Sequence, residues 1–146
     1  MLYLVHHAAA IRSEVDPQRP LSPAGRAHAE AMAQLAAGRG VAPAAIWHSG
    51  KLRARQTAEP FWRLCNPLAE FAAIRGLQPD DPPQWIRDLV SGDPRAIMLV
   101  GHMPSLPRIL QLLTGQEVDF PVHGLVALEA DGDGWKEVWR EPIRHP

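Results

Sequence analysis

The chain has 146 residues, of which 46% are hydrophobic and 21% charged, with a formal net charge of -1. This length fits one domain over residues 1–146, and the hydrophobic fraction is enough to build a core. Balanced charge argues against a protein that coats nucleic acid, and no apolar run approaches the roughly 20 residues of a membrane helix. The sequence shows no signal-peptide pattern and has a single cysteine, so we expect a cytoplasmic protein that binds no nucleic acid or membrane.

Apolar runs that stop abruptly at histidine are the main pattern along the chain. They are residues 2–5, followed by His6 and His7; residues 45–47, followed by His48; and residues 97–100, followed by Gly101 and His102. Apolar runs without polar alternation are typical of strands buried on both faces of a parallel sheet. Since ligands of open α/β sheets lie beyond the carboxyl ends of the strands, the pattern predicts chemistry at that edge.

Helices are expected between these strands. Ser22 and Pro23 have the chemistry of an N-cap and a first helical position, and glycines at 38 and 40 end that helix. Further helices are expected after Lys51, around residues 85–90 and from Pro104 to Gly115, and a short strand at 68–72.

The C-terminal region has a different pattern. Residues 123–130 and 135–140 flank the turn sequence Asp-Gly-Asp-Gly, which predicts an antiparallel hairpin. The order of elements predicts an α/β fold, a three-layer α/β/α sandwich with a mostly parallel sheet that ends in this hairpin.

Arg53 and the histidines together indicate an anion site. Arg53 falls in the first turn of the helix after the second strand, where free N–H groups and an arginine fork both favour phosphate. A nearby arginine disfavours the protonated form of an imidazole, so one histidine can stay neutral and nucleophilic. Such an imidazole can attack phosphorus and form a phosphohistidine, which water then hydrolyses.

Other interpretations of the histidines remain open at this point. His6, His7 and His102 could instead be metal ligands, but adjacent residues on a strand diverge and no nearby carboxylate completes the set. We therefore expect no metal and no cofactor. His48 could orient a catalytic imidazole or simply end its strand. His123 precedes a strand and could reach the rim of the site, although we favour a structural role for it.

Five segments make the interpretation more specific. They are Leu-Tyr-Leu-Val-His-His-Ala-Ala-Ala (2–10), Arg-Pro-Leu-Ser-Pro-Ala-Gly (19–25), Ser-Gly-Lys-Leu-Arg-Ala-Arg-Gln-Thr-Ala (49–58), Gly-Leu-Gln-Pro-Asp-Asp-Pro (76–82) and Val-Gly-His-Met-Pro (100–104). In this order they resemble the motifs of the histidine phosphatase superfamily (phosphoglycerate mutase-like), and within it the small bacterial phosphohistidine phosphatases. The resemblance implies that His7 is the nucleophile, that Arg53 and His102 hold the phosphoryl oxygens, and that Arg19 approaches the site.

The chain departs from the family pattern at one position. The family has an arginine before the nucleophile, where this chain has His6. A charge-assisted hydrogen bond is worth about 1.5–3 kcal/mol, so losing an arginine could weaken phosphate binding roughly tenfold to over a hundredfold. His6 offers one donor and is a cation only when protonated. The chain is then either an active enzyme favouring mildly acidic pH or using Arg19 in compensation, or a weakened or inactive phosphate-binding module. We favour activity.

The substrate is inferred from what the sequence lacks. Cleaving a phosphate ester needs an acid to protonate the leaving oxygen, and the candidates Asp80, Asp81 and Glu70 are not distinctive, since aspartates beside prolines usually form turns. A phosphoramidate bond depends less on such an acid, and the chain has no room for insertions that would cap the site. The expected substrate is phosphohistidine in a protein, with a small phosphate monoester as the alternative.

Overall fold

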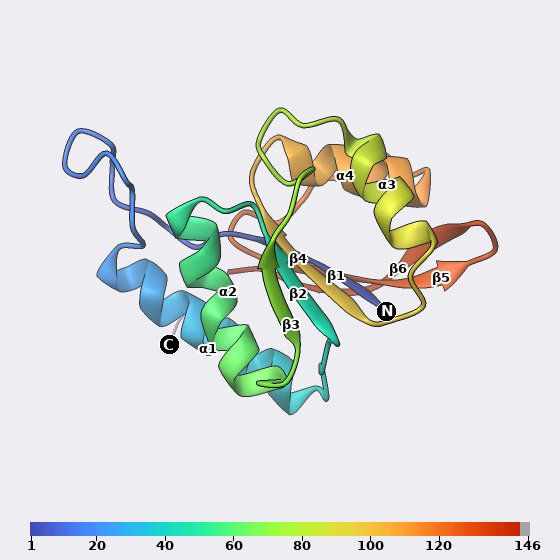
Figure 1. Ribbon diagram of the computed structural model, residues 1–146, viewed down its shortest axis with the longest axis horizontal. Coiled ribbons are helices and arrows are strands. Elements are labelled where there is room, and N and C mark those ends of the chain that lie inside the picture. Colours follow the sequence, from blue (N-terminus) through green and yellow to red (C-terminus); the bar gives the residue numbers. More distant parts are fainter. Residues whose placement is uncertain (144–146) are drawn as a thin grey trace.

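The computed structural model describes residues 1–143, in which helices cover both faces of one six-stranded sheet (Figure 1). The strands are β1 (Leu2–His6), β2 (Ala45–His48), β3 (Glu70–Ala73), β4 (Ile97–Gly101), β5 (Leu125–Asp131) and β6 (Gly134–Glu141). The helices are α1 (Pro23–Gly38), α2 (Leu52–Cys65), α3 (Pro83–Ser91) and α4 (Ser105–Thr114). The strand order is β3-β2-β4-β1-β5-β6. The first four strands of this order run parallel, and β5 and β6 are antiparallel, which confirms the predicted fold.

The apolar strands are buried because each face of the sheet has its own helix pair. In β1, Leu2 and Leu4 pack into a core with residues of α3 and α4, whereas Tyr3 and Val5 pack into a core with residues of α1 and α2. These two helix pairs lie on opposite faces of the sheet (Figure 1). A strand covered on both sides cannot alternate apolar and polar residues, which explains the unbroken apolar runs. The short third strand, Glu70–Ala73, begins two residues later and ends one residue later than the expected 68–72.

The start of α1 is fixed against the loop that follows β1. The Ser22 hydroxyl accepts a hydrogen bond from the Gly25 N–H at 3.0 Å, as expected for an N-cap. A Cβ at Gly25 would lie 2.0 Å from the Ala9 carbonyl oxygen, so only glycine allows this close approach. The glycine of the 19–25 motif therefore brings α1 onto the loop beside the strand end.

The topology gathers four chain segments at one edge of the sheet. In the parallel register His6 pairs with Gly101 and His48 with Val100, so β1, β2 and β4 end together. Because β5 runs antiparallel, its amino end lies at this same edge, where the His6 N–H donates to the Gly124 carbonyl at 3.0 Å. Among the described residues, none of the helices has both the length and the apolar character needed to cross a membrane.

Candidate active site

His7 lies immediately after β1, and within residues 1–143 only one of its ring nitrogens makes a hydrogen bond. Its Nδ1 is 2.7 Å from the Ala8 carbonyl oxygen, and since a carbonyl only accepts, Nδ1 carries the proton. Burial lowers the pKa of His7 to about 4; the Ala8 hydrogen bond opposes this, and the charges of Arg53 and Arg19 add to it. At neutral pH the Nε2 atom of His7 therefore has an available lone pair.

His102 follows β4, and its ring centroid lies 5.0 Å from that of His7. Its Nε2 is 2.6 Å from the Ser49 hydroxyl oxygen, which also accepts a hydrogen bond from the Lys51 N–H. Its Nδ1 is buried and has no hydrogen-bond partner within residues 1–143. Burial, followed by the charges of His7 and Arg53, lowers the pKa of His102 to about 3. If the Ser49 hydroxyl donates to Nε2, the neutral ring carries its proton on Nδ1 and can donate to an oxyanion.

Arg53 is the second residue of α2, as predicted. Its Nε is buried without a partner in the described part of the chain. The Thr57 hydroxyl donates to the Arg53 carbonyl at 2.8 Å and accepts from the Ala8 N–H at 3.0 Å. This bridge fixes the first turn of α2 to the segment that carries His7. The threonine of the 49–58 motif therefore has a structural role, which is to hold Arg53 and His7 near each other.

Arg19 approaches the histidines from the loop between β1 and α1. Its Nε donates to the Ile11 carbonyl at 3.1 Å, and its backbone has a positive φ of 51°. Its charge contributes to lowering the pKa of His7, His102 and Arg53. The structure thus brings His6, His7, Arg19, Arg53 and His102 to one edge of the sheet.

His123 also lies in this cluster, a placement that the sequence left as the less favoured of two alternatives for it. Its ring stacks on His6, with centroids 4.8 Å apart and 5° between the planes. Its N–H donates to His6 Nδ1 at 2.8 Å, and its Nδ1 is 2.6 Å from the His7 carbonyl oxygen. Burial is the largest cause that lowers the pKa of His6 to about 3, with the charge of His7 next.

The cluster contains a possible set of metal ligands that differs from the one considered in the sequence. One nitrogen each of His6, His7 and His123 lies within 4.8 Å of the others, with His123 in the place of His102. A metal needs a lone pair from every imidazole. His6 already uses its Nδ1 lone pair to accept the His123 N–H, so its neutral ring carries a proton on Nε2. The hydrogen bonds of the site thus favour an anion over a cation.

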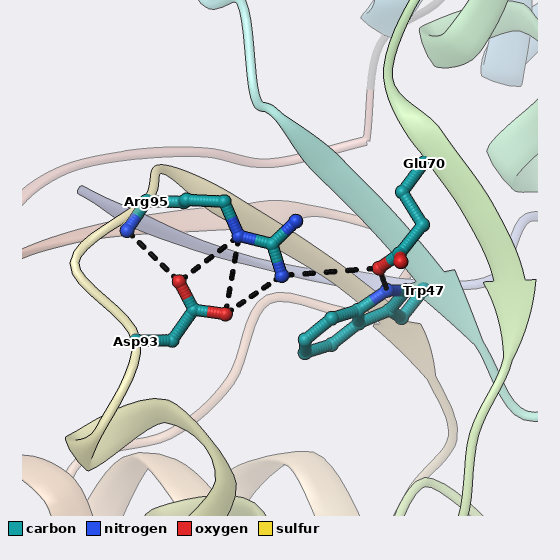
Figure 2. A network of polar contacts seen from close by, with 4 residues as sticks. All are labelled: Trp47, Glu70, Asp93 and Arg95. Atoms are coloured by element: carbon teal, nitrogen blue, oxygen red, sulfur yellow. Dashed lines mark hydrogen bonds and ion pairs between the residues drawn. The ribbon is translucent and has the colours of Figure 1, made fainter.

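The three carboxylates considered as proton donors lie in structural roles or on the surface. Asp81 accepts from the N–H groups of Gly76 and Gln78, which shapes the loop before α3. Glu70 stands at the amino end of β3, where it contacts Trp47 and Arg95 (Figure 2). Asp80 is exposed. Apart from histidine, the charged groups that act most on His7 and His102 are cations, so the site favours a bound anion.

Known proteins share this fold and, in part, this sequence. The sequence pattern of the histidine phosphatase superfamily, branch 1, matches residues 2–77, just over half of the chain. The uncharacterised chloroplastic protein At3g52155 of Arabidopsis thaliana is 25% identical over 152 residues, covering 94% of this chain and 70% of that protein.

Two solved structures are similar over nearly their whole length. The protein histidine phosphatase SixA, complexed with tungstate, superposes with a TM-score of 0.87 at 19% identity, covering 97% of this chain and 96% of SixA. A candidate SixA phosphohistidine phosphatase of Agrobacterium tumefaciens gives a TM-score of 0.82 at 27% identity, covering 98% of this chain and 97% of that one. The matched motifs include the segments that carry His7 and Arg53, and the chain belongs to the histidine phosphatase superfamily.

Proposed function

We propose that the protein is a phosphohistidine phosphatase that works through a covalent phosphohistidine at His7. One observation carries the proposal: the lone pair of His7 Nε2 stands in the same cluster as two buried nitrogens, Arg53 Nε and His102 Nδ1, that have no partner within residues 1–143. Buried donors without acceptors are costly, and a tetrahedral oxyanion supplies acceptors to both. Tungstate, which SixA binds in the solved complex, is such an oxyanion.

The reaction has two displacements at phosphorus. In the first, His7 Nε2 attacks, a new P–N bond forms, and the P–N bond to the leaving imidazole breaks as that imidazole takes a proton from solvent. In the second, water attacks the phosphoenzyme, the bond to His7 breaks, and inorganic phosphate is released. Arg53 and His102 stabilise the charge on the phosphoryl oxygens in both steps.

The choice of phosphohistidine rests on how the leaving group departs. An imidazole is basic enough near neutral pH to take a proton from water, whereas an alkoxide needs a positioned acid. The carboxylates Glu70 and Asp81 are engaged elsewhere, and the arginine charges that act on His7 are those of Arg53 and Arg19. Both points favour a P–N substrate over a phosphate monoester, and the likeness to the SixA structures supports a phosphorylated protein as the substrate.

The covalent step is tested by labelling with a radioactive phosphoramidate followed by denaturation. We expect a label that is lost in acid and kept in base, and that is absent in His7→Ala. The matched control is His145→Ala, which removes a histidine outside the described residues and should keep the label. Absence of label in the wild-type chain, with tungstate still bound, would instead identify a phosphate-binding module without turnover.

The substrate class is tested by comparing two substrates at equal concentration. A phosphohistidine peptide should be hydrolysed with a higher kcat/KM than an alkyl phosphate such as glycerol 2-phosphate, because the peptide has a basic leaving nitrogen whereas the alkoxide needs a positioned acid. The opposite order would favour a small-molecule phosphomonoesterase.

A further inference from the structure

His123 makes two hydrogen bonds whose directions are fixed by chemistry. A backbone N–H can only donate, so His6 Nδ1, at 2.8 Å from it, has no proton. A carbonyl oxygen can only accept, so His123 Nδ1, at 2.6 Å from the His7 carbonyl, has one. Together these contacts determine the tautomers of both rings. Neutral His6 carries its single proton on Nε2, and no hydrogen bond within residues 1–143 uses that atom.

The backbone at His123 is held in an unusual conformation that these contacts require. Its φ is 57°, in the left-handed region that most side chains avoid, although histidine tolerates it better than many. A turn from Pro121 to Gly124 keeps it there: the Gly124 N–H donates to the Pro121 carbonyl at 2.9 Å, and a Cβ at Gly124 would lie 2.5 Å from the Glu141 carbonyl oxygen. The loop thus presents both the N–H and the ring of His123 to the strand end.

We infer that His123 is a positioning residue, which holds His6 in the neutral Nε2–H form so that His6 supplies one uncharged donor to a bound phosphoryl group. This inference rests on the proposed function, and it assigns His6 a role different from that of the arginine that the family has at this position. The permanently charged guanidinium of that arginine is replaced by the single, uncharged Nε2–H donor of His6. The stacked ring of His123 also bonds to the His7 carbonyl, so it steadies the nucleophile's own segment.

Protonation of His6 is disfavoured from every side. A proton on Nδ1 would face the His123 N–H, so the hydrogen bond would become a repulsion. The rings of His7, His123 and His102 and the guanidinium of Arg53 all add to the effect of burial, which lowers the pKa of His6. His28 of α1 lines the same small cavity as His6 and His123. No described carboxylate is among the groups that act on His6, so His6 remains a neutral donor through the mildly acidic range.

The direct test is the nitrogen NMR spectrum of the histidine rings, which needs no enzymatic activity. Between about pH 5 and pH 8, His6 should show a bare Nδ1 and a protonated Nε2, with no titration. A proton on Nδ1, or an imidazolium near pH 6, would overturn the inference. So would zinc binding to His6, His7 and His123, since ligation through Nε2 needs the opposite tautomer.

Substitutions at His6 test the neutral donor, with tungstate as a probe that binds without turnover. His6→Gln keeps an N–H donor without charge, so its tungstate Kd should stay within about fivefold of wild type, whereas His6→Ala should weaken binding about tenfold to a hundredfold. Equal losses in both variants would contradict a donor role. Because the readout is binding, the result is separate from whether the chain hydrolyses phosphohistidine.

Substitutions at His123 test the positioning role. His123→Gly fits the positive φ but removes the ring, and His123→Asn also fits it and restores a donor toward the His7 carbonyl. The glycine variant keeps the backbone N–H that donates to His6 Nδ1 but loses the ring that ties residue 123 to the His7 carbonyl, so the N–H contact should loosen. His6 should then begin to titrate in the acidic range, and the tungstate Kd should rise severalfold. Asparagine should recover most of the affinity. An unchanged His6 spectrum in the glycine variant would show that the ring has no positioning role.

Discussion

The two ends of the sheet carry charge in opposite ways. Near the amino ends of β3 and β4, Arg95 donates to Asp93 at 2.7 Å and lies 3.8 Å from Glu70, which accepts the Trp47 indole N–H (Figure 2). Each charged group in this network has an opposite partner. At the carboxyl end, by contrast, the described groups other than histidine that act most on His7 and His102 are cations, and Arg53 Nε is buried without a partner in the described residues.

The comparison separates a satisfied surface network from a site prepared for a ligand. The paired network needs nothing further, and surface ion pairs contribute little to stability. At the carboxyl end a buried donor without an acceptor costs about 1–3 kcal/mol, a cost that a bound anion removes. Function is therefore indicated at the end where the charges remain unmatched.

Substituting one arginine at each end tests this contrast most strongly. Arg53→Met should lower kcat/KM for a phosphoramidate substrate about a hundredfold to a thousandfold, as expected when a donor to the reacting oxygens is lost. Arg95→Met is the matched control and should leave kcat/KM unchanged, since its partners Asp93 and Glu70 lie at the other end. Similar losses in both variants would refute the distinction.

Acid should destabilise the fold, because buried histidines at the carboxyl end of the sheet resist protonation in the folded chain. The pKa values of His6, His7 and His102 are lowered to about 3, about 4 and about 3, against an ordinary value of 6.5. Their neutral forms are fully favoured above pH 6.5, and stability is lost as pH falls from there toward these values, because only the unfolded chain takes up the protons. Each histidine contributes a slope of up to about 1.4 kcal/mol per pH unit.

Urea unfolding at several pH values measures this effect. The free energy of unfolding should be flat above about pH 7 and fall by a few kcal/mol toward pH 5. His6→Gln keeps a neutral polar group that does not titrate. The dependence of the unfolding free energy on pH should therefore become shallower by about the contribution of one histidine. A pH-independent free energy would show that these groups titrate alike in the folded and unfolded chain.

Ser49 should have a smaller effect, because it acts on the site through His102. In Ser49→Ala the hydroxyl that contacts His102 Nε2 is gone, so the proton is no longer directed to Nδ1. A neutral hydrogen bond is worth about 0.5–1.5 kcal/mol, so kcat/KM should fall roughly twofold to tenfold. Ser49→Thr keeps the hydroxyl and should recover much of the activity. If the alanine variant matches wild type, the tautomer of His102 is set by something else.

The sequence was sufficient to locate most of the cluster. Apolar runs that end in His7 and His102 must end together when their strands are parallel, and Arg53 follows the third such strand by a few residues. The sequence attributed the neutrality of the imidazoles to the nearby arginine. In the structure burial is the larger cause for His7 and for His102, since the depth of a side chain depends on packing that the sequence does not display.

The sequence favoured a structural role for His123 over a place at the rim of the site, because its approach to the site depends on strand direction. The hairpin at residues 123–140 was expected, but whether its first strand begins or ends beside His6 depends on which neighbour it pairs with. Because β5 pairs antiparallel to β1, the amino end of β5 lies at the site. The positive φ of His123 gave no signal in the sequence. Ser49 was part of the 49–58 motif, but nothing in the sequence indicated that it contacts His102.

The smallest expected effect is at the amino end of the sheet and completes the comparison. Glu70→Gln removes the negative charge beside Arg95 but keeps an amide oxygen for the Trp47 indole N–H. Arg95 still has Asp93, so the melting temperature should change little, and kcat/KM and the tungstate Kd should match wild type. Ser49→Asp instead places a carboxylate beside His102, close to the cations that act on it. That carboxylate should pair with these cations and repel tungstate, so tungstate binding should be abolished. If Glu70→Gln impaired tungstate binding as well, the two ends of the sheet would be coupled. The presence or absence of opposite partners would then not distinguish a binding site from a surface ion-pair network.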